Sequence, residues 1–126
     1  MTALLANVLL CAVAQAEDFH CPPQYPRETH GVVGDTNTFV SPSRLTRGGV
    51  YWGALGGQGE MMGDRTYNKS GIVVRFGLPE NEKKWFVCEY GGSSITMWTA
   101  IDRRATSCTM QQRARGGDVE VKAECK

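Results

Sequence analysis

This sequence offers few residues suited to catalysis. Its two histidines, His20 and His30, lie in a proline-rich stretch near the start. It has no G-x-S-x-G turn for a nucleophilic serine, and no glycine-rich loop leading to Lys and Ser or Thr that would hold a phosphate. A glycosidase needs two carboxyl groups in one cleft, whereas Asp64, Asp102 and Asp118 lie in turn-like sequence. These absences predict that the protein is not an enzyme.

The sequence also lacks a strong excess of charge. Lys and Arg total 14 and Asp and Glu total 13, so the formal net charge is +1. A protein that binds along a phosphate backbone usually carries a broad cationic surface. The basic pairs Arg103-Arg104 and Arg113/Arg115 are interpreted as solvated loop tips. We therefore expect no nucleic-acid partner.

No apolar run is long enough for a transmembrane span, which needs about 18 residues or more. The stretch from Ala3 to Val13 belongs instead to an uncharged leader, residues 1–16, which ends in Ala14-Gln15-Ala16. A short apolar core closed by an A-x-A site is typical of a secretory signal peptide. We expect cleavage after Ala16, which leaves residues 17–126 as a single exported domain in the bacterial periplasm.

The cysteines do not form the closely spaced pairs that bind zinc. Those that follow the leader are Cys21, Cys88, Cys108 and Cys125. An even number of cysteines in an exported chain predicts two disulfides. Neither a metal site nor a cofactor is expected.

The domain is predicted to be all-β. It shows no sustained helical stripe of apolar residues, and turn signals recur about every eight to twelve residues, as in folds built from short strands. The predicted strands are 50–52, 72–76 and a C-terminal four-strand meander over 85–90, 94–101, 106–114 and 118–125. The proline-rich N-terminal part is interpreted as a short edge strand or an extended arm held by Cys21, because proline is tolerated at sheet margins.

Two Gly-Gly pairs predict the registers of the meander. Two-residue hairpin turns favour glycine because their backbone needs positive φ. If Gly91-Gly92 form such a turn, Trp85 lies opposite Trp98 and Phe86 opposite Met97.

The second pair, Gly116-Gly117, places Cys108 opposite Cys125. Directly opposed residues are close enough for a disulfide. The predicted bonds are therefore Cys108–Cys125 and, by remainder, Cys21–Cys88; the alternative joins Cys21 to Cys125.

Residues 41–63 form the most glycine-rich part of the chain. One interpretation is a long crossing loop packed by its own Trp52 and Leu55. The other is a binding loop, because long loops on a rigid scaffold often carry function. A disulfide-linked β scaffold with such loops and no reactive constellation is typical of a binding or inhibitory protein, since rigid loops lose little entropy on docking.

Four segments carry a resemblance to a known family: Phe19–Pro23, Trp85–Gly92, Cys108 and Ala123–Lys126. Together they resemble small exported bacterial proteins that have been proposed as inhibitors of animal lysozymes. That family is grouped with the membrane-bound and periplasmic inhibitors of c-type lysozyme. The resemblance implies a small antiparallel β-barrel or curved sheet, and a loop that plugs the lysozyme cleft with hydroxyl and cationic groups.

The Ser-Gly-x-Gly-Ala-Arg-Tyr-like loop of the better-characterised inhibitors is not found in this sequence. The nearest candidates for partner contact are chosen by their chemistry. They are Tyr67, Lys69 and Ser70, then Ser93 and Ser94, and last Arg103-Arg104. Lys69 could pair with a carboxylate of a partner while Ser70 hydrogen-bonds another.

The sequence thus predicts an exported protein-binding protein, with a host lysozyme as its partner. The alternative is a glycan- or envelope-binding module that stacks Tyr51 or a tryptophan on sugars. That alternative predicts at least one tryptophan exposed on a concave surface, whereas pure core packing predicts that Trp52, Trp85 and Trp98 are all shielded. A third possibility is a subunit of an envelope assembly with an exposed edge strand.

Overall fold

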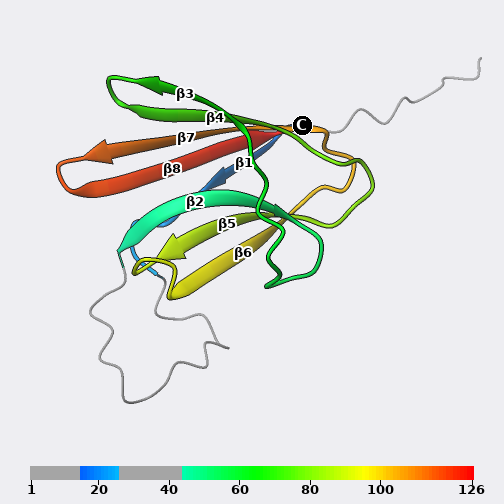
Figure 1. Cartoon of the computed structure of the whole chain (residues 1–126), viewed down its shortest axis with the longest axis horizontal. Coiled ribbons are helices and arrows are strands. Elements are labelled where there is room, and N and C mark those ends of the chain that lie inside the picture. Colours follow the sequence, from blue (N-terminus) through cyan, green and yellow to red (C-terminus); the bar gives the residue numbers. More distant parts are fainter. Residues whose placement is uncertain (1–14, 26–43) are drawn as a thin grey trace, which may run out of the picture.

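A computed structural model describes residues 15–25 and 44–126. Within these ranges the chain is all-β and forms two antiparallel sheets (Figure 1). The strands are β1 Glu17–His20, β2 Leu45–Trp52, β3 Asp64–Asn68, β4 Gly71–Gly77, β5 Lys84–Tyr90, β6 Ile95–Ile101, β7 Ser107–Arg115 and β8 Asp118–Cys125. One sheet has the order β1-β8-β7-β4-β3 and the other the order β2-β5-β6. The all-β prediction is confirmed, as curved open sheets and not as a closed barrel.

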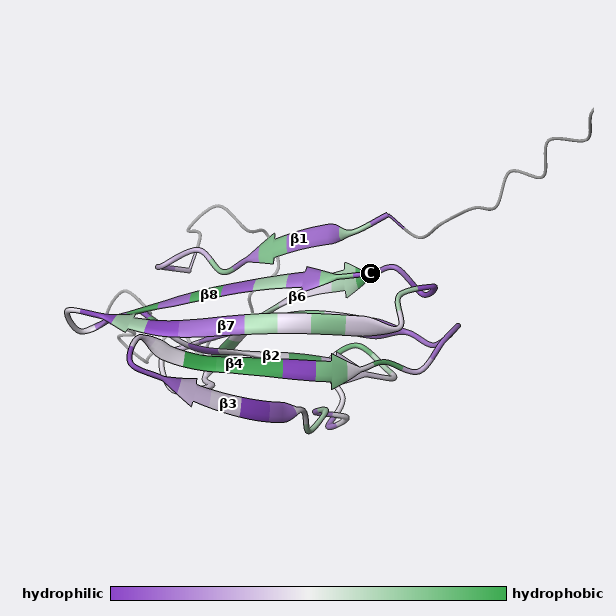
Figure 2. Ribbon diagram, turned by 90° about the horizontal axis from the view of Figure 1, so that it is seen from above, coloured by the Kyte–Doolittle hydropathy of each residue, from purple (hydrophilic) through white to green (hydrophobic). Residues whose placement is uncertain are grey.

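The core lies between the two sheets. On β4 the alternating residues Val74 and Phe76 are buried while Arg75 is exposed, which is the pattern of a strand with one wet face. The other sheet contributes Val50 and Phe86, both at most 1% exposed. Figure 2 shows how hydropathy changes at the edge of the five-stranded sheet, where hydrophilic β3 borders β4 with its hydrophobic centre.

Gly48 on β2 lies at a close approach between the two sheets. A Cβ at this position would lie 2.5 Å from Cγ1 of Val121 and 3.3 Å from Sδ of Met110. Only glycine lets the backbone of β2 cross β7 and β8 at this distance.

Both predicted disulfides are present. Cys108 lies opposite Cys125 in the β7–β8 register, with Cα atoms 4.1 Å apart. The two glycines of the connecting turn, Gly116 and Gly117, have φ of 53° and 91°, as a tight hairpin turn requires. The second bond, Cys21–Cys88, joins the end of the β1 arm to β5 and therefore links the two sheets. The edge position of β1 is also confirmed.

The predicted register of the β5–β6 hairpin is wrong by two residues. Trp85 lies opposite Ala100, and Trp98 lies opposite Val87. The turn contains four residues, 91–94, because Ser93 also adopts the left-handed region with φ of 87°. Ser94 then closes the turn by donating its hydroxyl to the carbonyl of Gly91 at 2.8 Å.

The predicted four-strand meander is also wrong. β5 and β6 form a hairpin of one sheet, whereas β7 and β8 form a hairpin of the other. Residues 102–106 carry the chain between the sheets and are held by a buried cation. Lys84 is 1% exposed, and its Nζ donates to the carbonyl oxygens of Pro79, Arg103 and Ala105.

The glycine-rich region differs from the sequence interpretation as well. The predicted strand 50–52 is confirmed as the end of β2, which begins earlier, at Leu45, whereas strand β3 after this region was not predicted. Trp52 and Leu55 do not form a buried core for the intervening loop, because they are 49% and 65% exposed. Pure core packing, which predicts that all three tryptophans are shielded, is therefore wrong for Trp52.

The part of the chain that the structure describes contains no helix, and so none that could span a membrane. Most of the expected leader lies outside these residues, as does His30.

Candidate functional site

The side of β5 that faces away from the core is unusually buried. Phe86, Cys88 and Tyr90 point into the core between the sheets. The residues between them, Val87 and Glu89, point the other way, yet they are 0% and 4% exposed. The outward side of the sheet β2-β5-β6 must therefore have its own cover of side chains. We call this side the aromatic face; it consists of Arg47, Tyr51, Glu60, Trp85, Val87, Glu89 and Trp98.

Three aromatic rings form most of that cover. The centroids of Tyr51 and Trp98 are 4.8 Å apart at 56°, and those of Trp85 and Trp98 are 6.2 Å apart at 70°. These tilted and edge-to-face geometries are the favourable ones for aromatic pairs. The rings come from all three strands, and Trp98 lies opposite Val87 in the register, so the cluster shields Val87 from water.

Hydrogen bonds fix the two indoles in place. Nε1 of Trp85 donates to the carbonyl oxygen of Gly53 at 3.0 Å. Nε1 of Trp98 donates to the hydroxyl of Thr96 at 2.9 Å. With their polar atoms occupied, the rings present a preorganised apolar surface.

Gly49 forms the floor on which the charged end of the face is built. A Cβ there would lie 3.2 Å from Cε2 of Tyr51, 3.5 Å from Oε1 of Glu60 and 3.6 Å from Nη2 of Arg47. The three side chains therefore converge above one glycine, where an added Cβ would crowd the Tyr51 ring and touch Glu60 and Arg47 at ordinary contact distance.

Arg47 bridges two carboxylates at this end. Its Nη2 bonds Oε1 of Glu60, and its Nη1 lies 2.6 Å from Oε2 of Glu89. The second contact has the distance of an ion pair but not the direction of a hydrogen bond, so Oε2 of Glu89 has no hydrogen-bond partner. Burial alone would lower the pKa of Arg47, but the bond with Glu60 and the charge of Glu89 outweigh it and raise the pKa. Burial and the same two carboxylates raise the pKa of Tyr51.

The loop after β2 delivers Glu60 to the cluster. The backbone N–H of Trp52 donates to the carbonyl of Gly59 at 3.0 Å, and that of Met61 donates to the carbonyl of Val50 at 2.8 Å. Glu60 is thereby held opposite Tyr51.

The same segment presents large apolar side chains to solvent. They are Trp52, Leu55 and Met62, exposed by 49%, 65% and 85%. Exposed apolar side chains grouped in one segment are typical of an interaction surface.

The contact residues predicted from the sequence lie elsewhere. Tyr67, Lys69 and Ser70 are exposed at the β3–β4 turn, where Asn68 Oδ1 accepts from the N–H and hydroxyl of Ser70 at 3.0 Å each. Figure 1 shows this turn at the same end of the molecule as the β5–β6 turn, but on the other sheet.

The β5–β6 turn carries the other predicted pair. Ser94 uses its hydroxyl within the turn, and Ser93 is exposed beside it. The structure thus brings each group to a hairpin tip and does not join the two groups into one site. Arg104 is used locally, since its side chain pairs with Asp102 at 2.8 Å.

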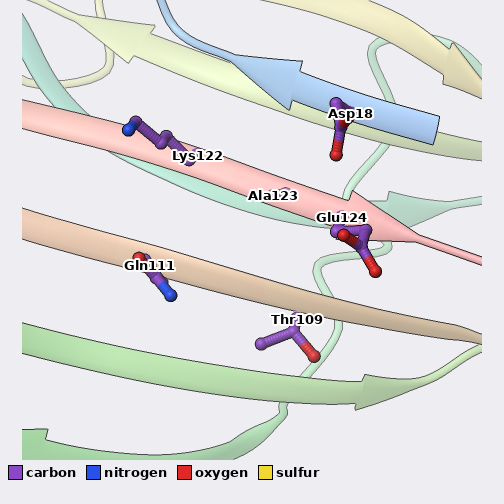
Figure 3. Close-up of a pocket in the computed structure, with 6 residues that line it drawn as sticks. All are labelled: Asp18, Thr109, Gln111, Lys122, Ala123 and Glu124. Atoms are coloured by element: carbon purple, nitrogen blue, oxygen red, sulfur yellow. The ribbon is translucent and has the colours of Figure 1, made fainter. Parts of the chain in front are cut away.

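A polar depression of about 340 Å³ lies on the outward side of the other sheet. Figure 3 shows its side chains projecting from β1, β8 and β7. It is lined by Asp18, Thr109, Gln111, Lys122, Ala123 and Glu124. Asp18 and Glu124 are directly opposed in the register, although like charges in this arrangement repel. This surface has no aromatic residue, so it offers a partner fewer anchors than the aromatic face does.

Sequence reasoning missed the charged half of the aromatic face. It found Tyr51, Trp85 and Trp98 as aromatic residues but assigned no role to Arg47, Glu60 or Glu89. One signal was available: Glu89 is the single acid within the strand sequence KWFVCEY, whose other residues are mostly apolar. A buried acid needs a cationic partner, and the fold alone revealed that this partner is Arg47.

The comparisons with known proteins relate the chain to one protein family. A family profile described as Type VI secretion system Tli immunity protein matches residues 40–126. The match covers more than half of the chain and includes every strand except β1. The chain matches neither a curated protein nor a solved structure.

Proposed function

Since the chain belongs to the Tli immunity protein family of the type VI secretion system, we propose that it binds one secreted effector and blocks that effector through the aromatic face. The family implies a protein partner and an inhibitory role. The single observation that carries the choice of surface is the burial of Glu89 and Val87 on the outward side of β5. A sheet face that merely met solvent would need no such cover.

The composition of the face suits a protein partner. Tyr, Trp and Arg are the residue types that contribute most to binding energy at protein interfaces. Here Tyr51, Trp98 and Arg47 lie together, with Trp85 alongside, and their positions are already fixed by the contacts described above. A preordered surface loses less entropy on association.

The mode of action that follows is steric. Once the effector is bound, the face and the exposed residues Trp52 and Leu55 would cover its working surface. The Cys21–Cys88 disulfide holds the two sheets together, and the Cys108–Cys125 disulfide fixes β7 to β8 within one sheet. No bond-making step by this protein is part of the proposal.

We place the encounter in the periplasm. The leader sequence carries the features of a signal peptide. The two disulfides form and persist in oxidising compartments such as the periplasm.

A contact-dependent competition assay tests the immunity function. The gene is deleted in the source bacterium, and the deletion strain is grown in contact with its parent. We expect the deletion strain to lose viability unless the gene is supplied again, and to survive beside a parent whose secretion apparatus is inactive. Equal survival of deletion strain and parent would contradict the proposal.

Variants in the same assay test the surface. Trp98→Ala removes the central ring and Leu55→Asp charges the neighbouring loop, so each should weaken protection. Gln111→Ala, on the outward side of the other sheet, is the matched control and should protect fully. The unfolding temperature of each variant separates loss of contact from loss of fold. Full protection by both face variants would show that the contact surface lies elsewhere on the protein.

The hairpin tips are the second candidate for the contact surface. Lys69→Ala and Ser94→Ala test them in the same competition, because both residues are in exposed turns. Loss of protection by these variants, with full protection by Trp98→Ala, would place the contact at the tips.

Lysozyme inhibition stays a prediction from the resemblance. A turbidity assay of c-type, g-type and i-type lysozymes with the purified mature chain measures it. Slowed lysis at micromolar excess is the expected result, and unchanged lysis of all three would remove lysozyme as a partner.

Glycan binding rests on a different observation, the half-exposed Trp52. Sugars that stack on this indole should quench its fluorescence. A Trp52→Phe variant distinguishes its signal from those of the partly buried Trp85 and Trp98.

A further inference from the structure

The charges of the aromatic face do not balance. Arg47 supplies one positive charge, and Glu60 and Glu89 supply two negative charges. Among the described residues, no other cation lies within ion-pair distance of either carboxylate. One guanidinium therefore serves both the buried Glu89 and the partly exposed Glu60, and the cluster keeps a net charge of −1.

The excess negative charge has a definite position. Oε2 of Glu89 lies 2.6 Å from Nη1 of Arg47 but accepts no hydrogen bond, and its side chain is 6% exposed. Glu60 is the carboxylate of the cluster that solvent reaches, because the Glu60 side chain is 37% exposed and pairs with the same guanidinium of Arg47. A cation that arrives from outside would therefore meet Glu60 first and be within reach of the field of Glu89.

The walls of the cluster favour one kind of cation. Tyr51 lies beside the cluster above Gly49, and its ring packs at a tilt against Trp98. Aromatic faces attract cations, and a guanidinium both stacks on a ring and donates in parallel to a carboxylate. An ammonium group can pair with the carboxylate but cannot stack in this way.

From this geometry we infer that the Glu60–Glu89 end of the aromatic face is a receptor for an arginine side chain of the bound partner. The inference rests on the proposed function and adds the chemistry of the partner: its contact surface presents arginine to this face. Binding would complete the charge balance and bring the guanidinium against Tyr51 and Trp98. Arg47 would remain between the carboxylates as the fixed half of the cluster.

A titration with a small probe tests the receptor without the effector. N-acetyl-arginine methylamide is added to the folded mature protein, and the indole N–H signals are followed by NMR. We expect a saturable shift of the Trp98 signal with a dissociation constant on the order of 1 mM, and no shift of Trp52. The citrulline analogue, which has the same shape without the charge, should leave Trp98 unchanged.

Two substitutions make the result specific. Glu60→Gln should weaken the arginine compound by about fivefold or more, since one charge-assisted bond is lost. Glu120→Gln is the matched control, because Glu120 is also 37% exposed and ion-paired but lies on the other sheet. Absence of a Trp98 shift, or equal affinity of Glu60→Gln and the native chain, would overturn the inference.

A competition assay with Glu60→Lys distinguishes failure of the arginine receptor from failure of the immunity function. The reversed charge should repel a partner arginine and abolish protection. If deletion sensitises the strain and Glu60→Lys still protects it, the arginine receptor is contradicted and the immunity function is supported. If deletion has no effect, the immunity function fails, whatever the titration gives.

Discussion

At the scale of single residues, buried polar groups determine how the loops are held. Lys84 is the clearest case, because its ammonium group lies inside the protein and donates to three carbonyl oxygens. Burial lowers the pKa of Lys84, and the charges of Asp102, Glu80 and Glu82 partly oppose that shift. Lys84 thereby supplies hydrogen-bond donors to carbonyl groups of two loops, the one before β5 and the one after β6.

Lys84→Met tests this role. The substitution keeps most of the volume but leaves three acceptors without a donor, so we expect a loss of about 3 kcal/mol in the free energy of unfolding. Chemical denaturation measures it. Lys83→Met is the control, since Lys83 is exposed and its replacement should change stability by less than about 0.5 kcal/mol. Equal effects of the two substitutions would contradict the role of Lys84.

Tyr90 makes the free energy of unfolding depend on pH in the alkaline range. Its hydroxyl donates to the carbonyl of Pro22 at 2.8 Å. Burial, with a smaller contribution from Tyr25, raises the pKa of Tyr90 from 10.0 to about 12. Between these values the unfolded chain loses the proton while the folded chain keeps it, so the free energy of unfolding falls as pH rises.

The expected result follows for Tyr90→Phe. At pH 7 the variant should be less stable by about 1 kcal/mol, through loss of the hydrogen bond. Between pH 10 and 12 it should lose less stability than the native chain does, and denaturation curves at a series of pH values measure both effects. Tyr67→Phe, at an exposed position, should match the native chain at pH 7. A parallel pH profile for Tyr90→Phe and the native chain would show that Tyr90 is not the titrating group.

At the scale of elements, one strand crossing decides whether the sheets can pack. β2 lies across β7 and β8, and Gly48 is one of the positions at which they are in close contact. The neighbouring glycine of the same strand, Gly49, serves the opposite side, where it leaves room for Tyr51. Two adjacent glycines thus let one strand support both the core and the aromatic face.

Gly48→Ala should therefore destabilise the protein. Its new methyl group would overlap Val121, and forcing an extra methyl into a packed core costs about 1–3 kcal/mol. Thermal unfolding measures the change. Gly77→Ala is the control at another strand position, because a Cβ there meets nothing within 4 Å. A native unfolding temperature for Gly48→Ala would show that the sheets are not packed at this distance.

At the scale of the whole molecule, the two disulfides have different tasks. Cys21–Cys88 links the sheets and spans 67 residues, whereas Cys108–Cys125 staples neighbouring strands and spans 17. In the chain-entropy description, a longer closed loop gives a larger stabilisation.

Replacing each pair by alanine separates these tasks. Loss of Cys21–Cys88 should cost about 4 kcal/mol and loss of Cys108–Cys125 about 3 kcal/mol. Denaturant titration of the two double variants under oxidising conditions measures the order. The reverse order would indicate that strand stapling matters more than the link between sheets. Free thiols at all four positions of the exported native chain would contradict both disulfides.

The sequence by itself determined what depends on local rules. Alternating apolar residues and recurrent turns specified an all-β domain. The Gly116-Gly117 pair specified a register that brought Cys108 to Cys125, because a two-residue turn leaves no freedom in the pairing. The same rule failed at Gly91-Gly92, since Ser93 and Ser94 extended the turn and shifted Trp98 opposite Val87.

Only the tertiary structure decided which residues share a surface. Arg47, Glu60 and Glu89 are distant in the sequence and meet because β2 pairs with β5 and the loop folds back on β2. The passage of the chain from one sheet to the other after β6 could not be predicted from the sequence either. It depends on hydrogen bonds from Lys84 to carbonyl groups of two loops. Local propensity acts over a few residues, whereas the aromatic face is assembled by pairings between distant strands.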